Sequence, residues 1–199
     1  MKIFISGGCK NGKSYYAQRY AKRSVQCLAK ARQTGPLYYI ATMKSADPED
    51  DERIVRHRRE RDGWGFTTIE QFFDIEKILE NCDHNGSFLL DSLTALLANE
   101  MFPPSGDINE HAAQKIKGAL LRITNNVKNI VIVSDYIYSD ALLYDPLTEK
   151  YRKSLAEIDR AVAGNCDIVL EAAYTNMVVH KGKDLFGQFN SRSDYEKIP

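Results

Sequence analysis

The stretch that decides the fold is Gly7-Gly8-Cys9-Lys10-Asn11-Gly12-Lys13-Ser14, which follows the apolar run Lys2–Ser6 and opens a long amphipathic segment. It matches G-x-x-x-x-G-K-[ST], the phosphate-binding loop that joins a strand to a helix. Its glycines let successive backbone N–H groups face a phosphate, and the helix N-terminus adds partial positive charge. A glycine-rich turn that binds nothing is the alternative, but the strand before and the helix after favour a nucleotide site.

The residue types in this loop predict distinct roles. We expect all eight residues to contact the nucleotide: Gly7, Gly8, Cys9, Lys10, Asn11, Gly12, Lys13 and Ser14. Lys13 should reach the β- and γ-phosphates as a catalytic cation, and the Ser14 hydroxyl should coordinate Mg²⁺. A second Mg²⁺ ligand is expected where the apolar run Phe88–Leu90 ends in Asp91. Asp91 could instead cap the helix that follows, although the loop favours the metal role.

Short apolar runs alternate with helical patterns along the chain. Strands are predicted over 2–6, 36–43, 66–71, 88–93, 129–135 and 167–173, with an edge strand over 177–181. Helices are predicted over 13–33, 48–61, 74–81, 94–101, 108–126 and 148–163. Ile130–Val133 is apolar on both faces, as in a central parallel strand. The fold class is therefore α/β, a P-loop NTPase-type, mostly parallel sheet with helices on both faces.

Length and charge narrow the partners. The chain has 199 residues, 27 basic and 27 acidic, so bulk positive charge does not favour nucleic acid. We expect one nucleotide-binding domain over 1–181 and a polar, loosely held tail over 182–199. The four cysteines form no C-x-x-C pair, and we find no membrane span or targeting segment. These features predict a cytoplasmic protein with a small-molecule partner.

The segment 47–61 reads D-P-E-D-D-E-R-I-V-R-H-R-R-E-R, with acidic residues ahead of basic ones. A solvated helix with charges that complement its dipole explains this order. However, Arg53, His57 and Arg61 recur every four residues, which places an imidazole between two guanidinium groups on one helix face. Such neighbours would lower the pKa of His57 and leave it a neutral nucleophile, while the arginines bind phosphate. The spacing alone leaves both interpretations open, a solvated helix and a phosphate-binding face with a nucleophile.

Together these motifs resemble the bifunctional adenosylcobinamide kinase and adenosylcobinamide-phosphate guanylyltransferase family of cobalamin biosynthesis. Besides the loop, the family's Y-I-A-T is similar to Tyr39–Thr42, and its L-L-D-C-L-T followed by asparagine is similar to Leu89–Thr94 and Asn99. Its D-x-E ahead of R-I-x-x-H-R-x-x-R resembles Asp47, Glu49, Arg53, Ile54, His57, Arg58 and Arg61. The loop alone would admit many functions, whereas these motifs in this order point to one.

The resemblance implies two reactions. An ATP or GTP γ-phosphoryl group would pass to the corrinoid, with Lys13 and with Mg²⁺ on Ser14 and Asp91. His57 would then take GMP from GTP and pass it to the corrinoid phosphate, giving adenosylcobinamide-GDP, with Arg53 and Arg61 binding phosphate. The partners implied are a corrinoid and a nucleotide, without nucleic acid, in a homo-oligomer that is a trimer in the family.

The chain departs from the family in several places. Lys10 and Asn11 stand where arginine and serine are usual, and Ser92 stands where cysteine is usual. The run Asp135–Tyr138 replaces N-E-V-G, so a carboxylate has moved or been lost. One extra residue lies near Trp64, so that the family's tryptophan corresponds to Phe66. A single-activity small-molecule kinase therefore stays open, as does a nucleotide-binding switch module, although the chain lacks the N-K-x-D base-reading motif.

Overall fold

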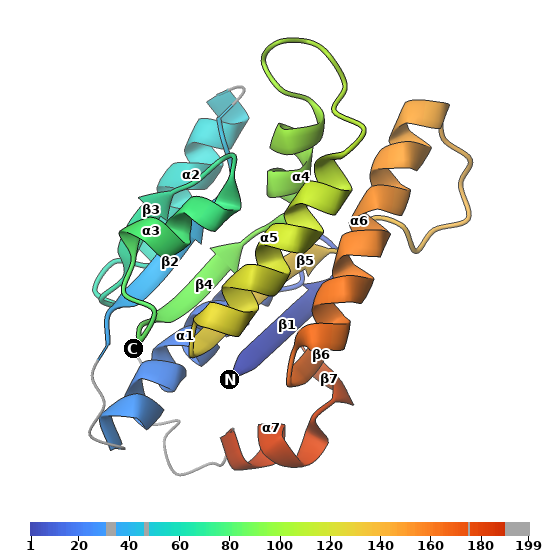
Figure 1. Cartoon of the computed structure of the whole chain (residues 1–199). Coiled ribbons are helices and arrows are strands. Elements are labelled where there is room, and N and C mark those ends of the chain that lie inside the picture. Colours follow the sequence, from blue (N-terminus) through green and yellow to red (C-terminus); the bar gives the residue numbers. More distant parts are fainter. Residues whose placement is uncertain (31–34, 46–47, 175, 190–199) are drawn as a thin grey trace.

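A computed structural model of the chain describes residues 1–30, 35–45, 48–174 and 176–189 (Figure 1). The strands are β1 (Lys2–Gly7), β2 (Leu37–Ala41), β3 (Thr67–Glu70), β4 (Ser87–Asp91), β5 (Asn129–Asp135), β6 (Ile168–Ala173) and β7 (Asn176–Lys181). The helices are α1 (Lys13–Lys30), α2 (Pro48–Glu60), α3 (Ile78–Asn81), α4 (Leu93–Met101), α5 (Ala112–Asn126), α6 (Pro146–Asn165) and α7 (Lys183–Phe189), with a 3₁₀ helix η1 (Ile75–Lys77).

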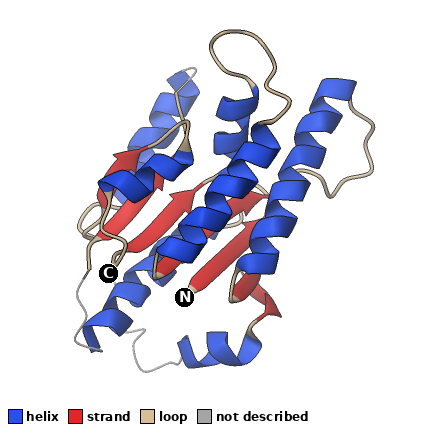
Figure 2. Ribbon diagram, in the orientation of Figure 1, coloured by secondary structure: helices blue, strands red, loops and turns tan. Residues whose placement is uncertain are grey.

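The strands form one seven-stranded sheet in the order β3-β2-β4-β5-β1-β6-β7. Every neighbouring pair is parallel except β6 and β7, which are antiparallel. The mostly parallel α/β sheet predicted from the sequence is thus confirmed (Figure 2). Since parallel strands end at the same edge, this edge collects the loops where such sheets bind ligands.

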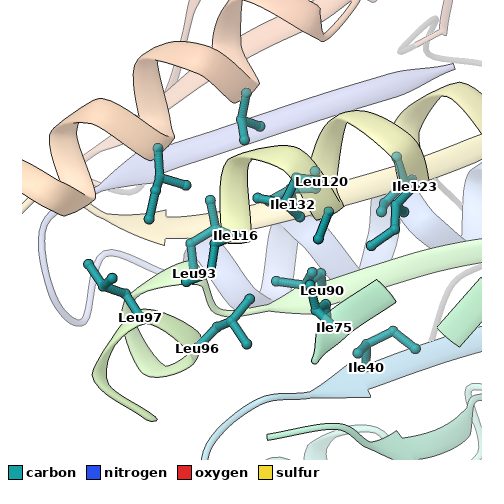
Figure 3. Close-up of a cluster of buried hydrophobic side chains, with 14 of the residues drawn as sticks. Ile40, Ile75, Leu90, Leu93, Leu96, Leu97, Ile116, Leu120, Ile123 and Ile132 are labelled. Carbon is teal, nitrogen blue, oxygen red and sulfur yellow. The ribbon is translucent and has the colours of Figure 1, made fainter. Parts of the chain in front are cut away.

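Helices cover both faces of the sheet. The helices α4, α5 and α6 lie over one face, with α1 and α7 on the other (Figure 1). Ile116, Leu120 and Ile123 of α5 pack over Leu90 and Ile132 (Figure 3). Successive residues of each strand point to opposite faces, so a strand buried on both faces needs apolar side chains throughout. This explains why the central strands read as unbroken apolar runs.

The end of the chain differs from the expectation of a loosely held tail beginning at residue 182. Residues 183–189 form the helix α7, in which Phe186 and Phe189 are buried. Their rings lie 5.7 and 5.9 Å from the ring of Tyr20 in α1. The two phenylalanines are three residues apart, which puts both on one helix face. The prediction is therefore wrong for 183–189, because this pair outweighs the polar composition; residues 190–199 lie outside the described part.

Several element ends also differ from the prediction. The helix expected from residue 148 begins at Pro146, because Asp145 caps it by accepting from the N–H groups of Leu147 (2.9 Å) and Thr148 (3.1 Å). The helix expected over 108–126 begins only at Ala112, and the one expected over 74–81 divides into η1 and α3. None of the helices in the described ranges is both long enough and apolar enough to cross a membrane.

Candidate functional site

The phosphate loop joins β1 to α1, as its sequence predicts. Lys13 at its end is 5% exposed, and its ammonium group lies 2.7 Å from Oδ1 of Asp135 and 2.5 Å from the Gly8 carbonyl oxygen. A Cβ atom on Gly7 would lie 2.6 Å from the carbonyl oxygen of Ala172, so the close approach of β6 requires glycine there. Gly12, at φ +79°, occupies the left-handed region that glycine favours.

Asp135 is the carboxylate beside the loop. Gly7 and Asp135 are paired at the ends of the parallel strands β1 and β5, and the Asp135 backbone N–H donates to the Thr94 hydroxyl at 3.0 Å. In the sequence, this position is distinguished only as a departure from the family's N-E-V-G. The structure shows that its carboxylate holds the loop lysine, a contact that no local pattern could reveal.

Asp91 ends β4, on the far side of β5 from the loop strand. Its Oδ2 accepts a hydrogen bond from the Tyr39 hydroxyl at 2.9 Å. The N-cap of α4 is Ser92, whose hydroxyl accepts from the Ala95 N–H at 3.4 Å. Asp91 is therefore not the helix cap, and its carboxylate faces the Tyr39 side chain of β2. The alternative prediction, that Asp91 caps this helix, is wrong because the cap is the next residue, Ser92.

The motif residues near Asp91 form one hydrogen-bonded cluster. Thr42 Oγ1 accepts from the Ser92 N–H and donates to the Ser92 carbonyl, each at 2.7 Å. The Asn99 side-chain amide donates to the carbonyl oxygens of Thr42 (2.8 Å) and Phe72 (3.1 Å). The ends of β2 and β4 and the helix α4 are thereby fixed to one another. These contacts give Asn99 and Thr42 a structural role, which the sequence motifs alone do not indicate.

The helix α2 carries His57, which is half-buried. Arg61 lies just beyond the last helical residue, is 7% exposed and stacks its guanidinium carbon 3.6 Å from the centre of the Tyr39 ring. Because Tyr39 also donates to Asp91, these contacts connect the end of α2 with the end of β4. The positions of Asp47 and of the Arg53 and Glu49 side chains lie outside what the structure describes, so the predicted Arg53–His57–Arg61 face is described only in part.

A cavity and two side-chain contacts lie around the end of α2. A cavity of about 650 Å³ lies beyond its end, lined by Arg58, Arg61, Asp62, Gly63, Gly65, Phe66, Thr68 and Glu70. Within it, Arg58 and Glu70 form an exposed ion pair at 2.6 Å. The ring of Trp64 lies 6.3 Å from that of Tyr15, which directly follows Ser14 in α1. The first turn after the phosphate loop thus contacts the segment that follows the histidine helix.

A buried acid on α6 contacts the end of β5 and the segment that follows it. Asp159 of α6 is 3% exposed, and its Oδ2 accepts from the hydroxyls of Ser134 and Tyr138, both at 2.9 Å. Among the described residues, Oδ1 has no hydrogen-bond partner. Burial raises the pKa of Asp159 to about 7 although both hydrogen bonds lower it. Burial also raises the pKa of Tyr138.

The segment after β5 is held by α6. Arg152, also buried, donates from Nε to the Ile137 carbonyl at 3.1 Å and pairs with Asp140 at 2.8 Å and Glu149 at 2.6 Å. Leu143, at the outer end of this segment, is 98% exposed. Its base is thus fixed next to Asp135, while its tip is open to solvent.

The chain is similar to several known proteins. The family described as "Cobinamide kinase / cobinamide phosphate guanyltransferase" matches residues 3–175. The bifunctional adenosylcobalamin biosynthesis protein CobU of Escherichia coli is 30% identical over 109 residues, which are 54% of each chain. The corresponding protein CobP of Pseudomonas aeruginosa is 26% identical over 85% of this chain and 91% of its own length. Among solved structures, the KaiC-like protein PH0186 of Pyrococcus horikoshii is similar over 90% of this chain and 78% of its own, with a TM-score of 0.49 and 10% identity.

Proposed function

The chain belongs to the cobinamide kinase / cobinamide phosphate guanyltransferase family, and from this premise we propose that its phosphate loop phosphorylates adenosylcobinamide and that His57 transfers GMP to the product. The two activities, cobinamide kinase and cobinamide-phosphate guanylyltransferase, are those of the family. Their assignment to residues of this chain rests on the geometry described above.

The kinase half rests on one observation: the buried Lys13 ammonium group at the ligand-binding edge of the sheet. In the proposed reaction, the corrinoid hydroxyl oxygen bonds to the γ-phosphorus of ATP or GTP, the bond to the β-phosphate oxygen breaks, and the hydroxyl proton is released. Lys13 stabilises the charge that develops on the phosphate oxygens, and the N–H groups of residues 7–14 orient the nucleotide.

The donor set at this edge fits Mg²⁺. The hydroxyl of Ser14 and the carboxylate of Asp91 are oxygen ligands, which Mg²⁺ prefers, and Ser92 rather than Asp91 caps the neighbouring helix. Such a site uses one or two protein ligands and completes its coordination with phosphate oxygens and water. When bound, Mg²⁺ neutralises phosphate charge. Tyr39 would orient Asp91 through its 2.9 Å hydrogen bond.

The transferase half is assigned to His57. A neutral imidazole nitrogen would attack the α-phosphorus of GTP, forming a P–N bond as the bond to pyrophosphate breaks. A phosphate oxygen of the corrinoid would then displace the imidazole, forming the P–O–P link and freeing His57. Arg61, already ordered against Tyr39, and Arg53 would bind the phosphates. The cavity beside Arg58 and Arg61 is large enough for a nucleotide.

Two features of the setting are also proposed. Cys9, Cys82 and Cys166 are free thiols, which supports work in a reducing cytoplasm. The trimeric state of the family would make this chain part of a homo-oligomer, without nucleic acid as a partner. Size-exclusion chromatography with light scattering would measure that state.

The test is incubation with adenosylcobinamide, GTP and Mg²⁺, followed by mass analysis of the corrinoid. We expect both adenosylcobinamide phosphate and adenosylcobinamide-GDP. Accumulation of the phosphate alone would reduce the protein to a single-activity kinase. Unchanged corrinoid with either ATP or GTP as donor would overturn the proposal and favour a nucleotide-binding switch.

A further inference from the structure

The end of β6 lies directly beside the phosphate loop. Gly7 of β1 pairs with Ala172 of β6, and the Asn11 side-chain amide donates to the Ala172 carbonyl oxygen at 3.1 Å. The loop thus contacts the end of β6 both at its first residue and at its middle. A residue that directly follows β6 is therefore close to the loop.

Tyr174 directly follows β6, and it is almost fully exposed to solvent. The residue is 91% exposed, and at φ +49° it lies in the left-handed region that bulky residues rarely adopt. Within the described ranges its side chain has no hydrogen bond or ring contact with the protein. A lone exposed tyrosine is ordinary on a protein surface. Its place beside the loop is what distinguishes this one.

The direction of the nucleotide follows from the strand order. Lys13 contacts Asp135 at the end of β5, and Asp91 ends the next strand on the same side, β4. Because a phosphate-loop lysine reaches the β- and γ-phosphates, the terminal phosphates lie on the β5 side of β1. We therefore expect the nucleoside on the opposite side of β1, where β6 and β7 lie (Figure 1).

We infer that Tyr174 is the surface on which the purine base of the nucleotide in the phosphate loop stacks; this rests on the nucleotide site proposed above. An exposed aromatic ring is suited to the role because every base has a π-face. Stacking does not involve the hydrogen-bonding edge of the base, so Tyr174 strengthens the binding of adenine and guanine nucleotides alike. Base selection is left to other groups.

The experiment separates base from phosphate. Calorimetric titrations with Mg²⁺ compare tripolyphosphate with the β,γ-imido analogues of ATP and GTP, using whichever analogue the parent protein binds more tightly. All proteins carry His57→Asn so that no GMP is transferred to the chain. Tyr174→Ala should weaken the analogue about 5- to 100-fold and leave tripolyphosphate unchanged. Tyr174→Phe keeps the ring and should bind as the parent does.

The outcomes are distinct. Parental analogue binding by Tyr174→Ala would overturn the inference, and so would an equal loss for the analogue and tripolyphosphate, which would indicate a distorted loop. An equal loss in Tyr174→Phe and Tyr174→Ala would assign the effect to the phenol hydroxyl instead of the ring. A parent protein that binds neither the analogues nor tripolyphosphate would contradict the proposed nucleotide site itself.

Discussion

The phosphate loop and the histidine helix differ in how the molecule holds them. The loop is fixed by neighbours on both sides of its strand, with Asp135 on Lys13 and Ala172 against Gly7 and Asn11. The helix α2 contacts the sheet through the exposed Arg58–Glu70 ion pair. The other contacts come from residues after the helix, through Arg61 on Tyr39 and Trp64 on Tyr15. The two candidate chemistries therefore lie in separately supported parts of one chain, and substitutions should separate them.

The largest expected effect is that of Lys13→Ala on the loop side of this comparison. Loss of the ammonium group should lower phosphorylation of adenosylcobinamide by at least about 100- to 1,000-fold, because it stabilises phosphate charge. Removing one partner also leaves the half-buried carboxylate of Asp135 unpaired. Lys13→Ala combined with Asp135→Asn is the control for that effect. Circular dichroism should show both proteins folded, and near-parental turnover in either would rule out the loop as the kinase site.

Asp91→Asn tests the strand between the two regions. Without the carboxylate charge, Mg²⁺-dependent nucleotide turnover should fall on the order of 100-fold, whereas nucleotide binding in EDTA should change little. Thermal stability should be nearly unchanged, since Ser92 and not Asp91 caps α4. Equal losses with and without Mg²⁺ would show that the residue acts through the fold and not through a metal.

Tyr39→Phe addresses the connection itself. It removes the 2.9 Å hydrogen bond to Asp91 but keeps the ring under Arg61. We expect a loss of about three- to tenfold in kinase turnover and little change in GMP transfer. The ratio of the two rates, measured on the same preparation, is the readout. A loss confined to GMP transfer would place Tyr39 with the histidine helix instead.

Asp159 lies outside both regions, and the effect predicted for it is on stability. Burial raises the pKa of Asp159 to about 7, so the folded chain holds a proton that the unfolded chain releases at lower pH. This contribution is present in acid and is lost as the pH rises through about 7. The free energy of unfolding of Asp159→Asn, taken relative to that of the parent, should therefore rise by on the order of 2–4 kcal/mol from about pH 5 to pH 8. A difference in free energy of unfolding that does not vary with pH would contradict the raised pKa.

The phosphate loop could be predicted from the sequence, whereas the tertiary contacts around it and around the histidine helix could not. The strand, the loop and Lys13 could be predicted because the motif is contiguous and its geometry is local. The partners of Lys13 and Asp91 could not, because Asp135 and Tyr39 reach them only through strand order. Arg61 was expected on the face of α2, but the helix ends at Glu60 and the side chain stacks on Tyr39, a tertiary contact that no helical period contains.

The wrong prediction for residues 183–189 has a related cause. Composition favoured a loose tail after Lys181, yet Phe186 and Phe189 bury themselves against α1. Two apolar residues in a polar stretch give a weak periodic signal, and its strength depends on a partner surface far away in sequence. The carboxylate at position 135 is the opposite case: the sequence marked it as a departure, and only the sheet register shows what it contacts.

One measurement tests the central claim that two separable chemistries share the chain. The parent, Lys13→Ala and His57→Asn proteins are each incubated with Mg²⁺ and GTP labelled at the α-phosphorus, and then denatured. We predict acid-labile, alkali-stable label on the parent and on Lys13→Ala, because the loop lysine is not needed for attack by His57. His57→Asn should carry none, yet still phosphorylate adenosylcobinamide. Label that persists in His57→Asn, or that vanishes with Lys13→Ala, would contradict the account.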